Sequence, residues 1–171
     1  MKTIGVSIPI PAPFAEELQA ARLEAGDPLA DAVPPHVTLM PPTPVEPDAE
    51  DALQDHLAKV AGSVTPFRMT LRGTGTFRPI SPVVFVAVAE GIANCEQLER
   101  AVRSGPVERV LDFPYHPHVT IAHGVSDEAL QEAFDGLAAY SCSMQVDSFS
   151  LYEHGHDGVW RPYRSFALGA G

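Results

Sequence analysis

The chain has 171 residues, of which 45% are hydrophobic, and this length predicts one compact domain or two small lobes around a shared core. It carries 22 Asp and Glu against 11 Lys and Arg, a formal net charge of −11, so a surface that grips duplex nucleic acid is not expected. No apolar run is long enough to cross a bilayer, and the amino-terminal residues lack a signal-peptide pattern. The two cysteines have no metal-binding spacing, so we expect a cytoplasmic protein without a disulfide framework or a membrane contact.

The first 45 residues predict a strand, a helix and a second strand. Apolar residues alternate with small or polar ones over residues 4–8, which is typical of a strand. Residues 13–26 repeat apolar side chains at helical spacing and end on a glycine. A proline-rich loop then leads into a strand that begins near residue 36, and the prolines within residues 41–44 should end it.

The middle of the chain predicts a helix followed by two strands. Asp48 is placed to cap a helix that runs to residue 60. Alternation returns over residues 67–72, and the glycine-rich residues 73–76 predict a loop. The nearly continuous apolar run at residues 83–89 predicts a buried strand.

The last part predicts two helices and three strands. Asn94 is a candidate cap for the first of these helices, and the next strand begins near residue 118. Ser126 precedes two acidic residues, a favourable start for a helix that reaches about residue 138. Residues 144–152 and 159–168 are strand-like.

One five-residue pattern, Pro-His-Val-Thr followed by a large aliphatic residue, occurs twice, at residues 35–39 and 117–121. Because strand side chains alternate between two faces, His and Thr share one face while the apolar residues point toward a core. Each copy presents an imidazole, which exchanges protons near neutral pH, beside a hydroxyl that can donate a hydrogen bond to an anionic oxygen. One copy alone is a weak signal, but the repetition favours a paired catalytic site.

The same order of elements follows both motifs: a helix and then two strands. This likeness predicts an α+β fold, bilobal and duplicated about a pseudo-two-fold axis. Antiparallel sheets would line a central groove, with the helices outside. Residues 1–171 would form a single domain whose two lobes carry one motif each, with His36 and His118 facing each other across the groove.

With both motifs, the chain resembles the two-histidine (2H) phosphoesterase superfamily, and within it the bacterial 2′-5′ RNA ligase-like proteins. The likeness extends to the opening strand, to residues 75–77 before the 83–88 strand, and to the closing segment 160–169. Members typically open 2′,3′-cyclic phosphates to 2′-phosphates without a metal. Some act on ADP-ribose 1″,2″-cyclic phosphate, and some reversibly join 2′-5′ RNA linkages.

The resemblance implies roles for the four motif residues. His36 would protonate the leaving ribose oxygen, His118 would activate water, and Thr38 and Thr120 would hold phosphate oxygens. Base and acid must flank phosphorus on opposite sides for an in-line opening, and two histidines across a groove meet that need. The implied activity is a metal-independent cyclic phosphodiesterase that requires no cofactor.

One position departs from the family pattern. Relatives often carry an arginine five residues after the second catalytic histidine, where this chain has His123. His123 is therefore a candidate phosphate contact, although strand alternation puts its ring on the other face. The phosphate charge could instead be met by Arg78, or by Arg161 or Arg164.

Five aromatic residues divide into two groups. Tyr115 and Phe77 are candidates to stack on a base at the mouth of the groove. Tyr152, Trp160 and Phe166 are expected to pack in the core.

Three alternatives remain open from the sequence. The chain could be a reversible 2′-5′ RNA ligase, or a nucleotide- or RNA-end-binding module without catalysis. A metal site could be built from several of its histidines, since His-x-His pairs occupy one face of a strand, but no third ligand type has a telling spacing. These histidines are His116, His118, His154 and His156. The expected partner is a small cyclic phosphate nucleotide, or an RNA end bearing a cyclic phosphate, and we expect a monomer.

Overall fold

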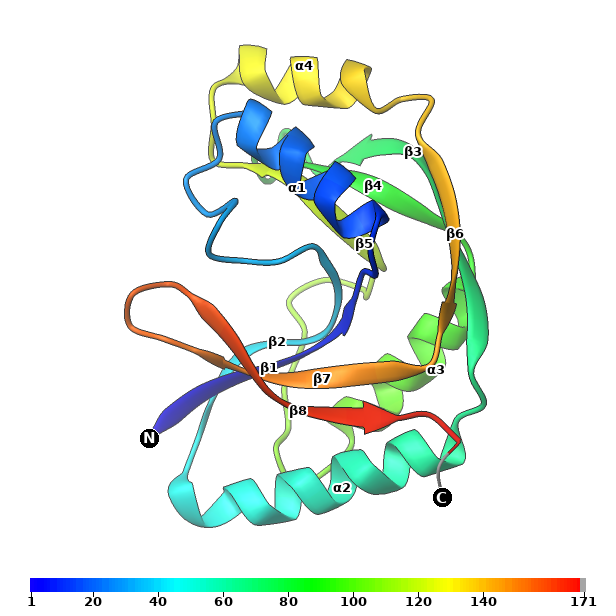
Figure 1. Cartoon of the computed structure of the whole chain (residues 1–171). Coiled ribbons are helices and arrows are strands. Elements are labelled where there is room, and N and C mark those ends of the chain that lie inside the picture. Colours follow the sequence, from blue (N-terminus) through cyan, green and yellow to red (C-terminus); the bar gives the residue numbers. More distant parts are fainter. Residues whose placement is uncertain (170–171) are drawn as a thin grey trace.

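Two four-stranded antiparallel sheets form the framework of the protein in a computed structural model that describes residues 1–169 (Figure 1). The strand order is β2-β1-β7-β8 in the first sheet and β5-β4-β3-β6 in the second, which confirms the predicted α+β fold. The elements are β1 (Lys2–Pro9), α1 (Phe14–Glu24), β2 (His36–Val45), the 3₁₀ turn η1 (Pro47–Ala49), α2 (Glu50–Ser63), β3 (Phe67–Thr76), β4 (Val83–Glu90), α3 (Ile92–Arg103), β5 (His118–His123), α4 (Asp127–Gly136), β6 (Ser141–Val146), β7 (Ser148–His154) and β8 (Trp160–Ala167). No helix within these residues is long and apolar enough to cross a membrane.

Helices cover one face of each sheet. α2 and α3 pack against the first sheet, and α1 and α4 pack against the second, so the two helix pairs lie at opposite ends of the molecule in Figure 1. The apolar residues of both motifs face these helices, because Val37, Leu39, Val119 and Ile121 are essentially inaccessible to solvent. The alternation predicted from the sequence is therefore confirmed, and the histidine and threonine of each motif lie on the other face.

Each motif lies on an edge strand. Among the strands of residues 1–169, β2 pairs only with β1 and β5 pairs only with β4, and these two edge strands contact each other where the sheets meet. Side chains at the start of β2 and β5 can therefore share one site.

The chain crosses between the sheets more than once. After β2, the strands β3 and β4 join β5 in the second sheet, and α3 then returns to pack on β2. β6 stays beside β3, but β7 and β8 complete the first sheet. The predicted helix and two strands follow the first motif, but a helix and three strands follow the second, and each sheet combines strands from both parts of the chain.

The prediction that prolines end β2 is wrong, because the strand continues to Val45. An edge strand has no partner on one side, so a missing N–H there costs no ladder hydrogen bond. The predicted loop at residues 73–76 is also wrong: these residues complete β3 and pair with β4 across a register shift. Gly75 is required there, because a Cβ at this position would lie 2.6 Å from the ring of Phe85.

The helix starts were predicted with mixed success. Ser126 caps α4 as expected, since its hydroxyl accepts a hydrogen bond from the Ala129 N–H at 3.1 Å. Asp48 lies in η1 instead of capping α2, and Asn94 lies inside α3, which follows Gly91 in a left-handed conformation. The predicted strand at residues 144–152 is two strands, β6 and β7.

Candidate active site

The two motif histidines are held in the same way. His36 opens β2 and His118 opens β5, and both rings are half-buried. The Nδ1 of His36 lies 2.7 Å from the Pro34 carbonyl oxygen, and the Nδ1 of His118 lies 2.6 Å from the His116 carbonyl oxygen. A carbonyl can only accept, so each Nδ1 carries a proton and donates it. Each Nε2 is then left to take a proton when the ring is neutral, or to give one when it is charged.

Both imidazoles favour the neutral form in the ligand-free protein. Burial lowers the pKa of His36 to about 4; the hydrogen bond to the Pro34 carbonyl acts in the opposite direction, and the charges of Arg22 and His118 lower the pKa by smaller amounts. Burial also lowers the pKa of His118; the hydrogen bond to the His116 carbonyl opposes this shift, and the His116 imidazole lowers the pKa by a smaller amount. An anion between the two rings would favour their charged forms and raise both pKa values.

The threonine of each motif offers an unused donor. Thr38 and Thr120 are half-buried and share a strand face with His36 and His118 respectively. Neither hydroxyl makes a side-chain hydrogen bond to any of residues 1–169. Both hydroxyls are therefore free to donate to an oxygen placed between the strands.

Aromatic rings pack against both histidines. The Trp160 ring centroid lies 4.6 Å from that of His36, and Phe77 meets the His118 ring edge-on at 5.0 Å. The prediction of Trp160 as a core residue is wrong, because it is partly exposed and belongs to the site. Tyr152 and Phe166 are buried, as predicted. Residues 36 and 160 are brought together by the sheet and by a hydrogen bond from the Trp160 backbone N–H to the Ala32 carbonyl oxygen. Neither feature can be recognised from a pattern in the sequence.

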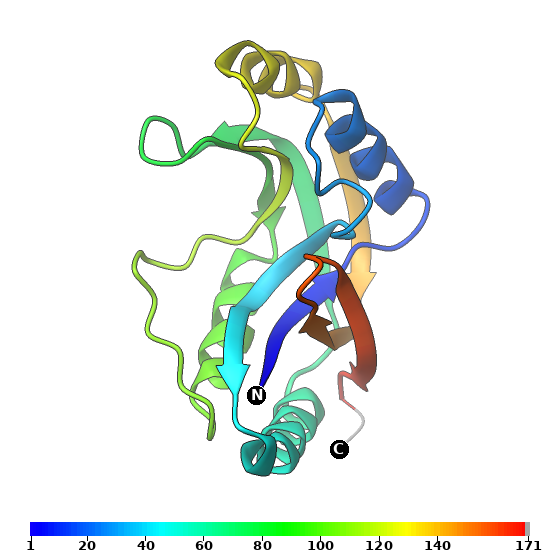
Figure 2. The same cartoon turned by 90° about the vertical axis from the view of Figure 1, so that its left-hand side faces the viewer.

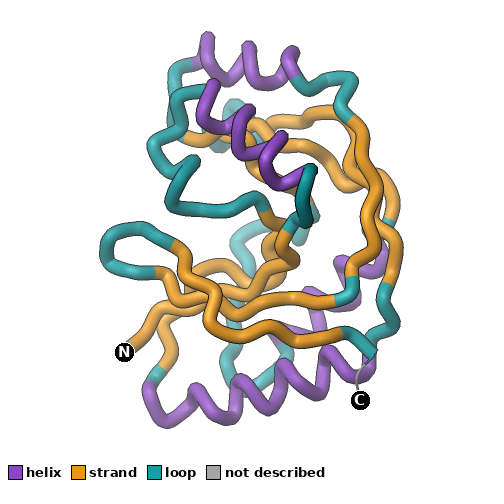
Figure 3. Tube along the Cα trace, in the orientation of Figure 1, coloured by secondary structure: helices purple, strands orange, loops and turns teal. Residues whose placement is uncertain are grey.

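A cavity of about 510 Å³ opens beside His118. The segment between α3 and β5 covers one side of it and runs along one edge of the molecule in Figure 2. It forms no helix or strand, like the other loops drawn in teal in Figure 3. Its Tyr115 hydroxyl donates to the Thr38 carbonyl oxygen at 2.7 Å and so ties the segment to β2. The lining is mainly apolar and comprises Thr38, Leu39, Pro41, Phe77, Ile80, Ser81, residues 109–116 and His118.

The structure gathers five of the seven predicted site residues at this place. His36, Thr38, His118 and Thr120 lie on the two adjoining edge strands, and the Tyr115 ring lines the cavity beside them. Burial raises the pKa of Tyr115, so its hydroxyl keeps its proton near neutral pH.

The arginines and the histidine considered from the sequence as phosphate contacts lie apart from the cavity. Arg78 donates to Thr76 and to Gln131 on α4, and it lines a separate hollow with acidic residues of α4. The His123 ring is exposed at the end of β5, as strand alternation suggested. Arg161 pairs with Asp157, and Arg164 donates to Gln54. The predicted phosphate contacts of Arg78 and His123 have no support from these positions and stay predictions.

The alternative of a histidine metal site gains nothing from the fold. No three His, Cys, Asp or Glu side chains within residues 1–169 come together in a way that could hold a metal ion. The edges of two sheets with paired imidazoles and hydroxyls are instead suited to general acid–base chemistry on an anionic ester.

Comparison with known proteins places this geometry in a family. The profile of the 2′-5′ RNA ligase superfamily matches residues 10–158. A Bacillus licheniformis protein named "Putative phosphoesterase" is 29% identical over 146 residues, which cover 84% of this chain and 86% of the relative. The crystal structure of E. coli LigT with 3′-AMP superimposes with a TM-score of 0.74 at 25% identity, covering 98% of both chains. The same protein with NADP⁺ gives 0.73 at 24% identity, again over 98% of both chains. The chain therefore belongs to the 2′-5′ RNA ligase superfamily, as a LigT-like phosphoesterase of the two-histidine kind.

Proposed function

We propose that this protein is a metal-independent cyclic phosphodiesterase that opens 2′,3′-cyclic phosphates to 2′-phosphates. The observation that carries the proposal is the pair of imidazoles on adjoining edge strands, each with Nδ1 held by a carbonyl and Nε2 free. Such a pair can supply one acid and one base to a single phosphorus atom.

The reaction needs two proton transfers on opposite sides of phosphorus. His118 takes a proton from water as the water oxygen attacks, and the bond from phosphorus to the ribose 3′-oxygen breaks. His36 gives its proton to that 3′-oxygen, which leaves a free hydroxyl and a 2′-phosphate. Thr38 and Thr120 donate to the non-bridging oxygens, where negative charge grows in the transition state.

The substrate that suits this site best is a small nucleotide or an RNA end. The cavity beside His118 is walled by Phe77, Tyr115 and aliphatic residues, which suit a flat base better than a second phosphate. Three solved structures of E. coli LigT hold a nucleotide, namely 3′-AMP, ATP or NADP⁺. The net charge of −11 weighs against long RNA. A cytoplasmic location stays a prediction.

Turnover by EDTA-treated protein tests the proposal. The substrates are the four 2′,3′-cyclic nucleotides, ADP-ribose 1″,2″-cyclic phosphate and an oligonucleotide with a cyclic end, with product position read by chromatography. We expect 2′-phosphates from at least one of them. Ligation of that oligonucleotide to a 5′-hydroxyl RNA without hydrolysis would instead favour the ligase alternative. Binding without any turnover would leave a nucleotide-binding module.

Replacing Thr38 or Thr120 by valine should lower kcat/KM by about 1.5–3 kcal/mol in transition-state free energy, the usual worth of a hydrogen bond to charge. Valine keeps the β-branched shape that suits a strand but removes the donor. Thr3→Val is the matched control, because Thr3 lies on β1 opposite Pro44, away from the motif. Unchanged kinetics in both motif variants would make these threonines simple strand residues.

A further inference from the structure

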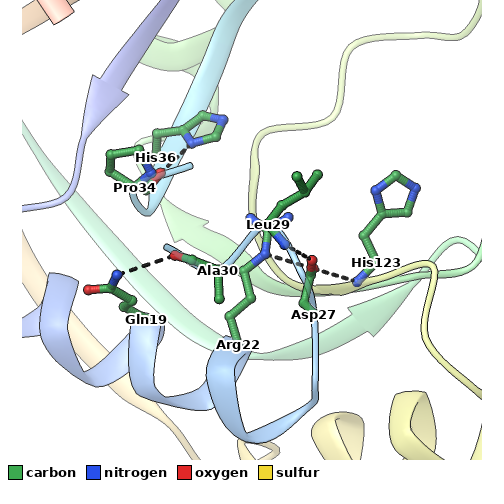
Figure 4. A network of polar contacts seen from close by, with 8 residues as sticks. All are labelled: Gln19, Arg22, Asp27, Leu29, Ala30, Pro34, His36 and His123. Carbon is green, nitrogen blue, oxygen red and sulfur yellow. Dashed lines mark hydrogen bonds and ion pairs between the residues drawn. The ribbon is translucent and has the colours of Figure 1, made fainter. Parts of the chain in front are cut away.

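A buried carboxylate joins three segments behind the two motifs (Figure 4). Asp27, in the loop between α1 and β2, is 4% exposed. Its oxygens accept hydrogen bonds from Arg22 Nε at 2.7 Å, from the backbone N–H of Leu29 at 2.9 Å and from the backbone N–H of His123 at 3.0 Å. The loop that leads to the first motif is thereby bonded to α1 and to the end of the strand that carries the second motif.

Only one of the three guanidinium nitrogens of Arg22, Nε, makes a hydrogen bond in this network. Arg22 is 6% exposed, and its one hydrogen bond to the rest of the described chain runs through Nε. The only enclosed side-chain nitrogen or oxygen without a partner in residues 1–169 is the Ser7 hydroxyl oxygen. The Nη1 and Nη2 atoms of Arg22 therefore still reach solvent, although the stem that carries them is buried.

These free donors lie on the side of the histidines. In Figure 4 the Arg22 side chain rises from α1, and its head lies between the segments that carry His36 and His123. Arg22 is close enough to His36 that its charge contributes to the lowered pKa of that imidazole. The arginines considered from the sequence, in contrast, are engaged elsewhere with Gln131, Asp157 and Gln54.

We propose that Arg22 is a phosphate-binding residue of the candidate active site, with Asp27 holding Nε so that Nη1 and Nη2 donate to the phosphate that lies between His36 and His118. The proposal rests on the proposed function for the identity of the ester, but on the hydrogen-bond geometry for the arginine. A guanidinium has two parallel N–H groups that match two oxygens of a phosphate. A charge on a buried stem is also less screened than one on the surface. One focused cation would let a chain of net charge −11 bind an anion without a basic surface.

Two charge-removing changes in the same ion pair separate a ligand role from a structural one. Arg22→Gln removes the cation, whereas Asp27→Asn keeps it and retains an oxygen that can accept from Arg22. We expect Arg22→Gln to weaken binding of 2′-AMP and of inorganic phosphate about tenfold to hundredfold by calorimetry. Asp27→Asn should weaken it less than about threefold, since it removes no donor to the ligand. Arg68→Gln, at an exposed pair with Glu90, is the control for loss of one positive charge.

A second readout does not depend on catalysis. Removing the Arg22 charge should raise the pKa of His36 in the free protein, measured by NMR of the imidazole, because that charge now lowers it. If Arg22→Gln does not fold, Arg22→Lys decides, since it keeps a charge beside Asp27 but loses the paired donors and should bind phosphate about threefold to tenfold more weakly.

Equal losses in Arg22→Gln and Asp27→Asn would show a structural pair and overturn the proposal, as would unchanged phosphate affinity in Arg22→Gln or Arg22→Lys. Absence of phosphate binding by the wild-type protein would overturn it as well. Absence of turnover with phosphate binding intact would contradict the proposed function alone.

Discussion

Replacing either His36 or His118 by alanine should lower turnover of a 2′,3′-cyclic phosphate by about two to four decades, the usual contribution of a positioned acid or base. Both variants should fold, because each ring is half-buried and makes one hydrogen bond, to a backbone carbonyl. The measurement is kcat at saturating substrate, with thermal unfolding as a check of the fold.

The matched control is His156→Ala, because His156 is exposed in the turn between β7 and β8. It should leave kcat within about twofold, as expected for a surface substitution. Removing both motif histidines should cost little more than removing one, because an acid and a base that serve one step act as a unit. Wild-type turnover in either well-folded single variant would falsify the assignment of the pair.

The face on which each motif histidine lies was predictable from sequence, because it depends on alternation alone. Period-two patterning decides which face a side chain occupies, so Val37 and Val119 turn toward the core and the motif histidines turn away. A helix start such as Ser126 also depends on local sequence, since its hydroxyl accepts a hydrogen bond from the backbone N–H three residues ahead.

The rest of the site depends on which strands become neighbours, and alternation does not specify that. Trp160 reaches His36 only because β8 lies in the same sheet as β2 and because the Trp160 backbone N–H donates a hydrogen bond to Ala32, in the loop before the first motif. Arg22 and Asp27 are ordinary helix and loop residues in the sequence, and the role proposed for them depends on a contact that only the fold makes, the hydrogen bond from the His123 backbone N–H to Asp27. Proline placement in β2 likewise follows from its edge position, which is a property of the whole sheet.

The pH dependence of kcat/KM should be a bell whose maximum lies below pH 6.5. The acid must begin protonated and the base neutral, and burial lowers the pKa of His36 to about 4 and lowers that of His118 as well. As pH rises above these values the free protein loses the protonated acid, so the alkaline limb should start on the acidic side of neutral. As pH falls further, the base is protonated too, which gives the acidic limb.

Binding of the substrate anion should move this profile. A phosphate between the rings favours imidazolium, so both pKa values rise in the complex and the bell for kcat should lie to the alkaline side of the bell for kcat/KM. Rates measured from pH 4.5 to 9 in the wild type and in the two alanine variants also separate the roles. Residual activity of His36→Ala should lack the alkaline limb, and that of His118→Ala should lack the acidic limb. Loss of the acidic limb in His36→Ala would mean that the roles are exchanged, with His118 as the acid. A flat profile over this range, or activity that EDTA removes and zinc restores, would contradict the two-histidine mechanism itself.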